Sequence, residues 1–127
     1  MAGYSGTPLD KKLGFKPGMK AHLIGAVYKA PGGVTTTSKA EAPLDFVHLF
    51  TKERADLEKR FPALMNALAP AGMFWVSWPK GASKVKTDLN ENVVREIGLE
   101  AGLVDVKVCA VDDVWSGLKF VRRLKDR

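Results

Sequence analysis

The chain has 127 residues and a formal net charge of +6 at pH 7, and hydrophobic residues make up 46% of it. This is globular composition, and the length predicts one domain over residues 1–127. The single cysteine, Cys109, excludes an internal disulfide and a cysteine-based zinc cage. No apolar run approaches the roughly 20 residues of a membrane span, and the first residues lack a signal-peptide pattern. We therefore expect a cytoplasmic protein with no membrane contact.

Turn residues and hydrophobic runs divide the chain into a short N-terminal helix followed by strands and helices. Thr7, Pro8 and Asp10 predict the start of that helix, and Gly14 predicts its end. The expected strands are residues 19–27, 34–37, 44–50, 73–78, 103–111 and 118–124. The last of them is expected to run antiparallel, because six residues cannot hold a crossover helix.

Two longer amphipathic helices are predicted among these strands. Thr51 can cap the first, and Pro62 predicts a kink or break near Arg60–Phe61. Asp88 begins the sequence DLNE, a capping-box analogue that predicts the start of the second helix, which ends at Gly102. Buried strands that alternate with such helices predict a three-layer, mostly parallel, Rossmann-like α/β sheet.

Several passages resemble known families. Residues 68–76, LAPAGMFWV, are similar to the helix-to-strand passage of class I S-adenosylmethionine-dependent methyltransferases, and residues 13–21, LGFKPGMKA, resemble the entry to their first strand. The whole chain also resembles a small bacterial family known only as a domain of unknown function. That likeness is carried by residues 3–9 (GYSGTPL), 75–80 (WVSWPK), 106–112 (VKVCAVD) and 115–118 (WSGL). The resemblance implies a truncated methyltransferase-like fold, and the second family lends no activity.

The chain departs from the methyltransferase pattern in the two passages that bind the cofactor in that family. The family has a glycine-rich loop after its first strand and an acidic residue after its second, whereas residues 25–33 read GAVYKAPGG without G-x-G spacing. After the second strand, Glu41 is a poor substitute for the family's acidic residue. Our first hypothesis is therefore a methyltransferase-like domain without catalysis that binds a small ligand or a protein partner.

The candidate site follows from the fold class. Ligands of open α/β sheets bind beyond the carboxyl ends of the strands, so four loops are expected to converge at one edge. The candidate ligand-binding residues on these loops are Gly25, Tyr28, Phe50, Trp78, Lys80, Ser83, Lys84, Asp112 and Trp115. Trp78 beside Lys80 and Lys84 suits a planar or phosphorylated ligand, although a packed Trp and a solvated loop explain them equally well.

Other groups carry weaker hypotheses. Asp112 and Asp113 could supply a general base, but acidic residues are common in turns. His22 and His48 lie in strands without a third ligand, so no metal site is predicted, and Cys109 is expected to be inert packing. Catalytic residues are not assigned.

Two alternatives remain open beside the first hypothesis. One is a small methyltransferase that uses S-adenosylmethionine in an unconventional pocket with Tyr28, Phe50, Trp78 and Lys80. The other is a basic nucleic-acid-binding module, since residues 1–39 contain six lysines and one acidic residue and residues 119–127 carry a net charge of +4. The run 34–37 could form an exposed edge that pairs two copies into a homodimer.

Overall fold

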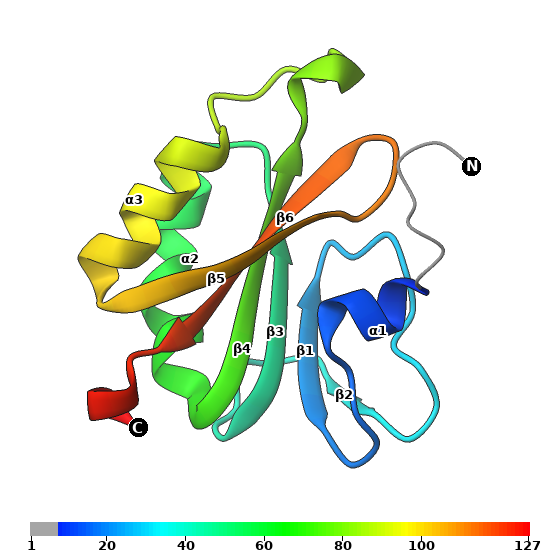
Figure 1. Cartoon of the computed structure of the whole chain (residues 1–127), viewed down its shortest axis with the longest axis vertical. Helices are drawn as coiled ribbons and strands as arrows, with labels where there is room; N and C mark the ends of the chain where they lie inside the picture. The colour runs from blue at the N-terminus through cyan, green and yellow to red at the C-terminus, as the bar shows by residue number, and fades with distance from the viewer. Residues whose placement is uncertain (1–7) are drawn as a thin grey trace.

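A computed structural model describes residues 8–127, and the predicted helix cap at Thr7 lies outside them. Figure 1 shows one twisted sheet with helices α2 and α3 on one side of it and α1 beside β1 and β2. The six strands lie in the order β2-β1-β3-β4-β6-β5. Their bounds are Lys20–Ile24 (β1), Thr35–Thr37 (β2), Leu44–Phe50 (β3), Leu68–Pro79 (β4), Leu103–Ala110 (β5) and Trp115–Arg122 (β6).

The strand directions confirm the predicted fold class. β1 pairs in parallel with β2 and with β3, and β3 pairs in parallel with β4. β6 runs antiparallel to both of its neighbours, β4 and β5. The sheet is therefore mostly parallel with an antiparallel C-terminal strand.

The helices begin at residues other than the predicted caps. They span Leu9–Leu13 (α1), Arg54–Ala67 (α2) and Glu91–Ala101 (α3), with single 3-10 turns at Gly81–Ser83 and Leu124–Asp126. The Asn90 side chain caps α3 by accepting a 2.9 Å hydrogen bond from the Val93 amide. Asp88 instead accepts a 2.7 Å hydrogen bond from the Arg54 amide at the start of α2. Its carboxylate therefore links the two helices' N-terminal regions.

Helix α2 runs through Pro62 without the break that the sequence predicts. Pro62 is exposed, whereas Leu57, Phe61 and Leu64 are buried against the sheet on both sides of it. Packing of that apolar face holds the helix together, and solvent can reach the carbonyl group that loses its partner at the proline.

Two separate clusters of buried side chains form the core, one on each face of the sheet. Phe74, Val76 and Trp78 of β4 point into the cluster beneath α2 and α3. The intervening Trp75 points into a smaller cluster beside α1, together with Phe46. Alternate residues of a strand point to opposite faces, so we call these the α2/α3 face and the α1 face.

The short helix α1 is held on its face by hydrogen bonds from the sheet. The Trp75 indole N–H donates to the carbonyl oxygen of Leu13 at 2.9 Å. The Lys107 ammonium donates to the carbonyl oxygen of Lys12 at 2.8 Å. Five residues alone would not form a stable helix in water, so these contacts and the buried Leu13 fix its position.

The connection from β1 to β2, residues 25–34, contains no helix although the two strands are parallel. Parallel neighbours are usually joined by a dozen or more residues that include a helix. Here the connection packs Tyr28 and Val34 against the α1-face cluster. Among residues 8–127, no helix has the length and apolar character needed to cross a bilayer.

Candidate functional site

The parallel strands β1 and β3 end at one edge of the sheet, where β6 begins. Gly25 follows β1, Phe50 ends β3, and Trp115 begins β6. The Phe50 and Trp115 rings meet edge to face, with centroids 5.2 Å apart. We call this edge the rim, and it is where open α/β sheets hold their ligands.

A hollow of about 360 Å³ opens at the rim. Its lining residues are Gly25, Phe50, Thr51, Lys52, Glu53, Asp56 and Trp115. Gly25 has φ +69°, a conformation that other residues rarely adopt, and it brings the backbone close to Phe50. The volume is at the lower end of the range for small-molecule sites.

Asp56 gives the rim hollow a fixed negative charge. Its carboxylate accepts hydrogen bonds from the Thr51 hydroxyl at 2.7 Å and from Arg60 Nε at 2.8 Å. The Thr51 hydrogen bond, and next the Arg60 one, lower the pKa of the Asp56 carboxyl. A carboxyl with a lowered pKa is a weak base, so Asp56 contributes charge to the hollow rather than proton transfer.

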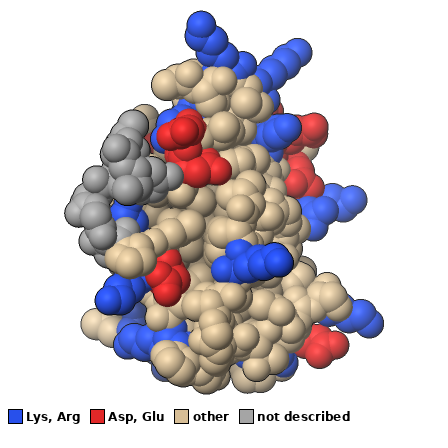
Figure 2. All heavy atoms as spheres, turned by 90° about the vertical axis from the view of Figure 1, so that its right-hand side faces the viewer, with Lys and Arg blue, Asp and Glu red and all other residues tan. Residues whose placement is uncertain are grey.

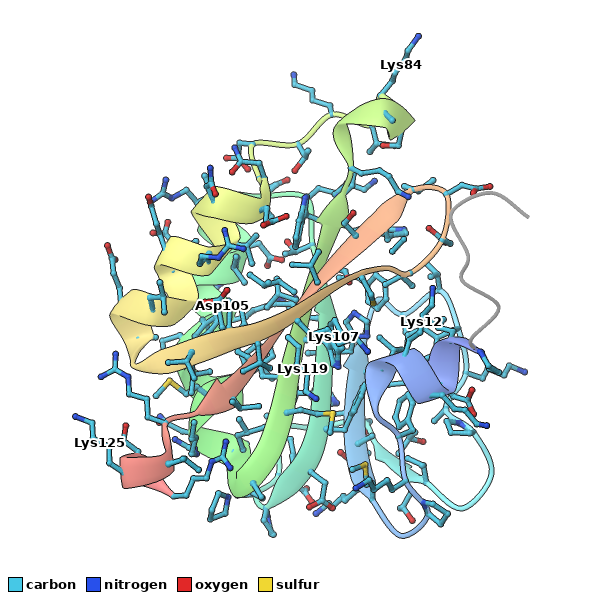
Figure 3. The ribbon with its side chains drawn as sticks, viewed as in Figure 1. Lys12, Lys84, Asp105, Lys107, Lys119 and Lys125 are labelled. Carbon is cyan, nitrogen blue, oxygen red and sulfur yellow. The ribbon has the colours of Figure 1, made fainter. Side chains whose placement is uncertain are left out.

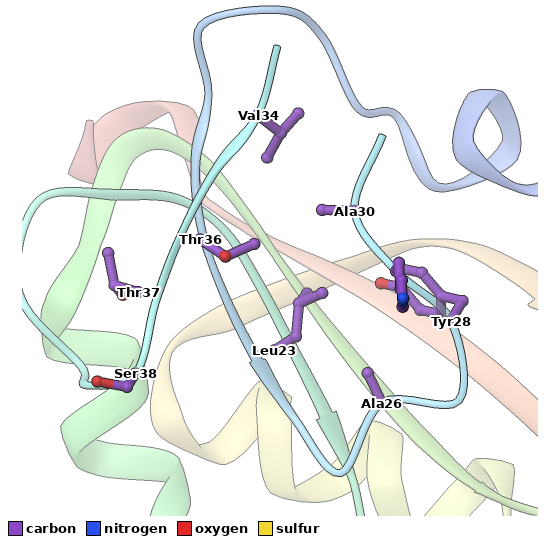
Figure 4. A pocket seen from close by; sticks show the side chains of 9 residues that line it. Leu23, Ala26, Tyr28, Ala30, Val34, Thr36, Thr37 and Ser38 are labelled. Atoms are coloured by element: carbon purple, nitrogen blue, oxygen red, sulfur yellow. The ribbon is translucent and has the colours of Figure 1, made fainter. Parts of the chain in front are cut away.

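A second, larger hollow of about 760 Å³ lies between β2 and the connection 25–34. Figure 4 shows the side chains around it, which come from β1, β2, that connection and Ser38 directly after β2. Its lining residues are Leu23, Ala26, Tyr28, Lys29, Ala30, Val34, Thr36, Thr37 and Ser38. None of these is acidic.

A chain of three polar side chains crosses the α1 face beneath the Tyr28 ring. The Tyr28 hydroxyl lies 2.8 Å from His48 Nδ1, and His48 Nε2 lies 2.7 Å from the Ser77 hydroxyl. Burial lowers the pKa of His48 to about 3. It also raises the pKa of Tyr28, with a smaller contribution from Cys109. All three groups are therefore uncharged at neutral pH.

Ser77, His48 and Tyr28 have the residue types of a nucleophile, a base and an orienting group, but the geometry does not allow catalysis. Ser77 and His48 are both 0% exposed, so no substrate reaches the serine oxygen. Every buried side-chain nitrogen and oxygen among residues 8–127 has a hydrogen-bond partner. The chain of bonds therefore serves to satisfy polar groups within the core.

The structure brings together some of the residues predicted for ligand binding and separates others. Tyr28, Phe50 and Trp115 form a contiguous aromatic group, with Tyr28 and Phe50 centroids 6.1 Å apart. Trp78 is 5% exposed and packs on the opposite, α2/α3 face, so it does not join them. Gly25 lies at the rim beside Phe50.

The remaining predicted residues shape loops. Asp112 accepts hydrogen bonds from the amides of Val114 and Trp115, both at 2.8 Å, which fits the turn explanation. The Ser83 hydroxyl donates to the Lys80 carbonyl oxygen at 2.7 Å. Lys84 is exposed and ends the 3-10 turn beyond β4 (Figure 3), and it is not among the residues that line the rim hollow.

Sequence reasoning did not assign four residues of the rim hollow. Thr51 and Lys52 belong to the loop after residues 44–50 that is expected to reach this edge, but neither is predicted as a ligand-binding residue, and Glu53 and Asp56 are expected only on the solvent-exposed side of the helix that follows. Their position directly after β3 is a signal for a rim location, because every loop that follows a parallel strand reaches that edge.

Comparison with known proteins supports the fold. No family model and no curated protein matches the sequence. A solved structure of 1,6-didemethyltoxoflavin-N1-methyltransferase from Burkholderia thailandensis has a TM-score of 0.63 at 14% identity, over 90% of this chain and 74% of that one. A putative methyltransferase from Thermoplasma acidophilum has a TM-score of 0.58 at 11% identity, over 87% and 71%.

A structure described as a pericyclic reaction enzyme has a TM-score of 0.61 at 10% identity. It is matched over 92% of this chain but only 47% of its own length, so the chain spans about half of that enzyme. Identities this low establish architecture and not activity. Residues 8–127 thus have a methyltransferase-like α/β fold in a reduced form.

Proposed function

We propose that this chain is a methyltransferase-like domain that binds a small ligand at the rim hollow and does not transfer methyl groups. The observation that carries this proposal is the helix-free connection 25–34. The family resemblance calls for a glycine-rich loop at this point, where the backbone approaches the cofactor. Here the connection instead inserts Tyr28, which is hydrogen-bonded to His48.

The end of β2 supports the same proposal. The family carries an acidic residue there for the cofactor ribose, whereas the hollow beside β2 is lined by Thr36, Thr37 and Ser38 and has no carboxylate. Glu41 lies beyond the strand and is exposed. Neither of the two features that hold S-adenosylmethionine in the family is therefore found in its usual place.

The rim hollow favours a small, partly planar ligand. Phe50 and Trp115 offer aromatic surface, and Lys52 and Glu53 offer exposed charges at its mouth. A planar group against the rings with a polar substituent at the mouth would use both properties.

A chain that does not transfer methyl groups is expected not to bind the methyl donor or its product. Calorimetric titration with S-adenosylmethionine and S-adenosylhomocysteine tests this. We expect no saturable heat with either compound, and micromolar binding of either one would overturn that part of the proposal. A thermal-shift screen with small planar metabolites tests the rim. A true ligand raises the Tm of the wild type and of Val27→Ala, an exposed control on the connection 25–34, but not of Trp115→Leu. Compounds that still raise the Tm of Trp115→Leu would show that the ligand binds outside the rim hollow.

The two alternatives have less support. An unconventional methyltransferase pocket needed Trp78 beside Tyr28 and Phe50, yet Trp78 lies on the other face. A nucleic-acid-binding surface would need an extended basic stripe. Figure 2 shows Lys and Arg at separate places on one face, with Asp and Glu between them.

A further inference from the structure

Two lysines of the antiparallel pair β5–β6 lie directly opposite each other on the α1 face. Lys107 is the cross-strand partner of Lys119, and Lys119 is in turn the partner of Trp75 on β4. Figure 3 shows Lys107 and Lys119 next to each other, with Lys12 of α1 nearby. Like charges at directly opposite positions destabilise an antiparallel pair.

The C-terminal end of α1 provides a hydrogen-bond partner for Lys107 but not for Lys119. Lys107 donates to the Lys12 carbonyl oxygen, and Trp75 donates to the Leu13 carbonyl oxygen. The two preceding carbonyl groups accept from backbone amides. No hydrogen bond or ion pair with any described residue engages the Lys119 ammonium.

The Lys119 ammonium is nevertheless partly enclosed. A Cβ atom built on Gly14 would lie 3.8 Å from Lys119 Nζ, so the ammonium group sits beside the turn that ends α1. Burial, then Lys107 and Lys16, lower the pKa of Lys119. The other titratable groups nearby are Lys12 and the Cys109 thiol, whose pKa is raised by burial. Lysine charges therefore converge here without an acidic side chain within 4 Å of Lys16, Lys107 or Lys119 in residues 8–127.

We propose that Lys107 and Lys119, with the positive charge of Lys16 adding to theirs, form an anion site that takes the phosphate group of a small molecule. A phosphate dianion would pair with the Lys119 ammonium and relieve the repulsion between the opposed strands. Its tetrahedral oxygens can accept hydrogen bonds from the ammonium groups of Lys107 and Lys119, which lie on two neighbouring strands. The site lies on the α1 face beside Gly14 and shares no residue with the lining of the rim hollow, so it stands independently of the function proposed above.

Titration of the whole chain with inorganic phosphate at low salt tests the site, with lysine side chains followed by NMR. We expect the Lys119 signals to shift in a saturable manner and the Lys119 pKa to rise when phosphate is bound, because a bound dianion favours the charged amine. Lys119→Gln is expected to weaken phosphate binding at least tenfold. Lys125→Gln removes the same charge from an exposed site far away in Figure 3 and should leave the affinity unchanged.

A stability measurement guards against a variant that merely fails to fold. Without phosphate, Lys119→Gln should have a Tm no lower than the wild type, since it removes a repulsive contact. Phosphate should raise the Tm of the wild type and of Lys125→Gln more than that of Lys119→Gln. Equal weakening by Lys119→Gln and Lys125→Gln, or no saturable shift of Lys119, would overturn the proposal. So would a short oligonucleotide that binds through Lys119 when inorganic phosphate does not, because the partner would then be a nucleic acid.

Discussion

The Tyr28 hydroxyl and His48 Nδ1, 2.8 Å apart, join the connection after β1 to the centre of the sheet. His48 is completely buried, and its other ring nitrogen is bonded to Ser77. The imidazole therefore depends on Tyr28 for one of its two hydrogen bonds. This contact anchors a ten-residue connection that has no secondary structure of its own, which explains how it stays packed on the α1 face.

Removing that hydroxyl should destabilise the fold. Tyr28→Phe keeps the ring packed but leaves His48 Nδ1 without a partner in the core, at a cost of about 1–3 kcal/mol in the free energy of unfolding. Urea denaturation measures the change. Thr36→Val removes an exposed hydroxyl from the same hollow and should alter stability by less than about 0.5 kcal/mol. Equal stability of Tyr28→Phe and the wild type would show that the bond contributes nothing.

The same histidine predicts how stability depends on pH. The pKa of His48 is about 3 in the folded chain against an ordinary value of 6.5, so below pH 6.5 the unfolded chain binds a proton that the folded chain does not. The contribution of His48 to the free energy of unfolding is therefore fully present above pH 6.5 and is lost as pH decreases toward 3. The loss between pH 7 and pH 5 is expected to be about 2 kcal/mol.

Urea denaturation at the two pH values measures this loss. The Asp56 pKa is lowered, so its contribution is lost only as pH falls below the ordinary carboxyl range, and the interval from pH 7 to pH 5 isolates the histidine. His48→Gln lowers stability at both pH values and should abolish most of the difference between them. A difference that persists in His48→Gln would assign the effect to another group.

The sequence predicted the strands better than the helix ends. Residues 44–50 were expected as a strand and form one with the same bounds, because a continuous apolar run between turns has few alternatives. Strand β4 begins at Leu68, five residues before the prediction, since Leu68 pairs with Leu44 across a bulge. Helix caps depend on which side chain reaches the first amides, and long-range contacts such as Asp88 to Arg54 decide that.

The rim could be anticipated from the sequence, but the direction of individual side chains could not. The rule for parallel sheets brought Gly25, Phe50 and Trp115 to one edge. Trp75 and Trp78 are three residues apart on one strand and must face opposite ways. Residues 74–78 are all buried, so hydrophobicity alone does not tell which tryptophan faces α2 and α3. The hydrogen bond between His48 and Ser77 could not be predicted from the sequence either. It joins β3 to β4, and the register of these two strands is known only from the folded structure.

Arg122 predicts a measurable contribution to the end of α2. Its Nη2 atom donates to the carbonyl oxygens of Met65 and Leu68 at 2.6 and 2.9 Å. Arg122→Met keeps much of the side-chain volume but loses both bonds, and we expect a loss of about 1.5–3 kcal/mol in the free energy of unfolding. Arg123→Met, at the exposed neighbouring position, should change stability by less than about 0.5 kcal/mol. Comparable losses in both variants would point to a general effect of removing positive charge.

Gly98 lies inside α3, where alanine would ordinarily be the better helix former by about 1 kcal/mol. A Cβ atom at this position would overlap the ring of Phe120, which is fully buried on β6. Gly98→Ala should therefore destabilise the chain by about 1–3 kcal/mol despite its helix propensity, because α3 must move away from the sheet. Thermal unfolding measures the effect, and Gly81→Ala, where a Cβ meets nothing, is the control. In a background that carries Phe120→Leu, the smaller side chain makes room for the methyl group. The added cost of Gly98→Ala should shrink there, and an unchanged cost would mean that contact with Phe120 is not what excludes a side chain from this position.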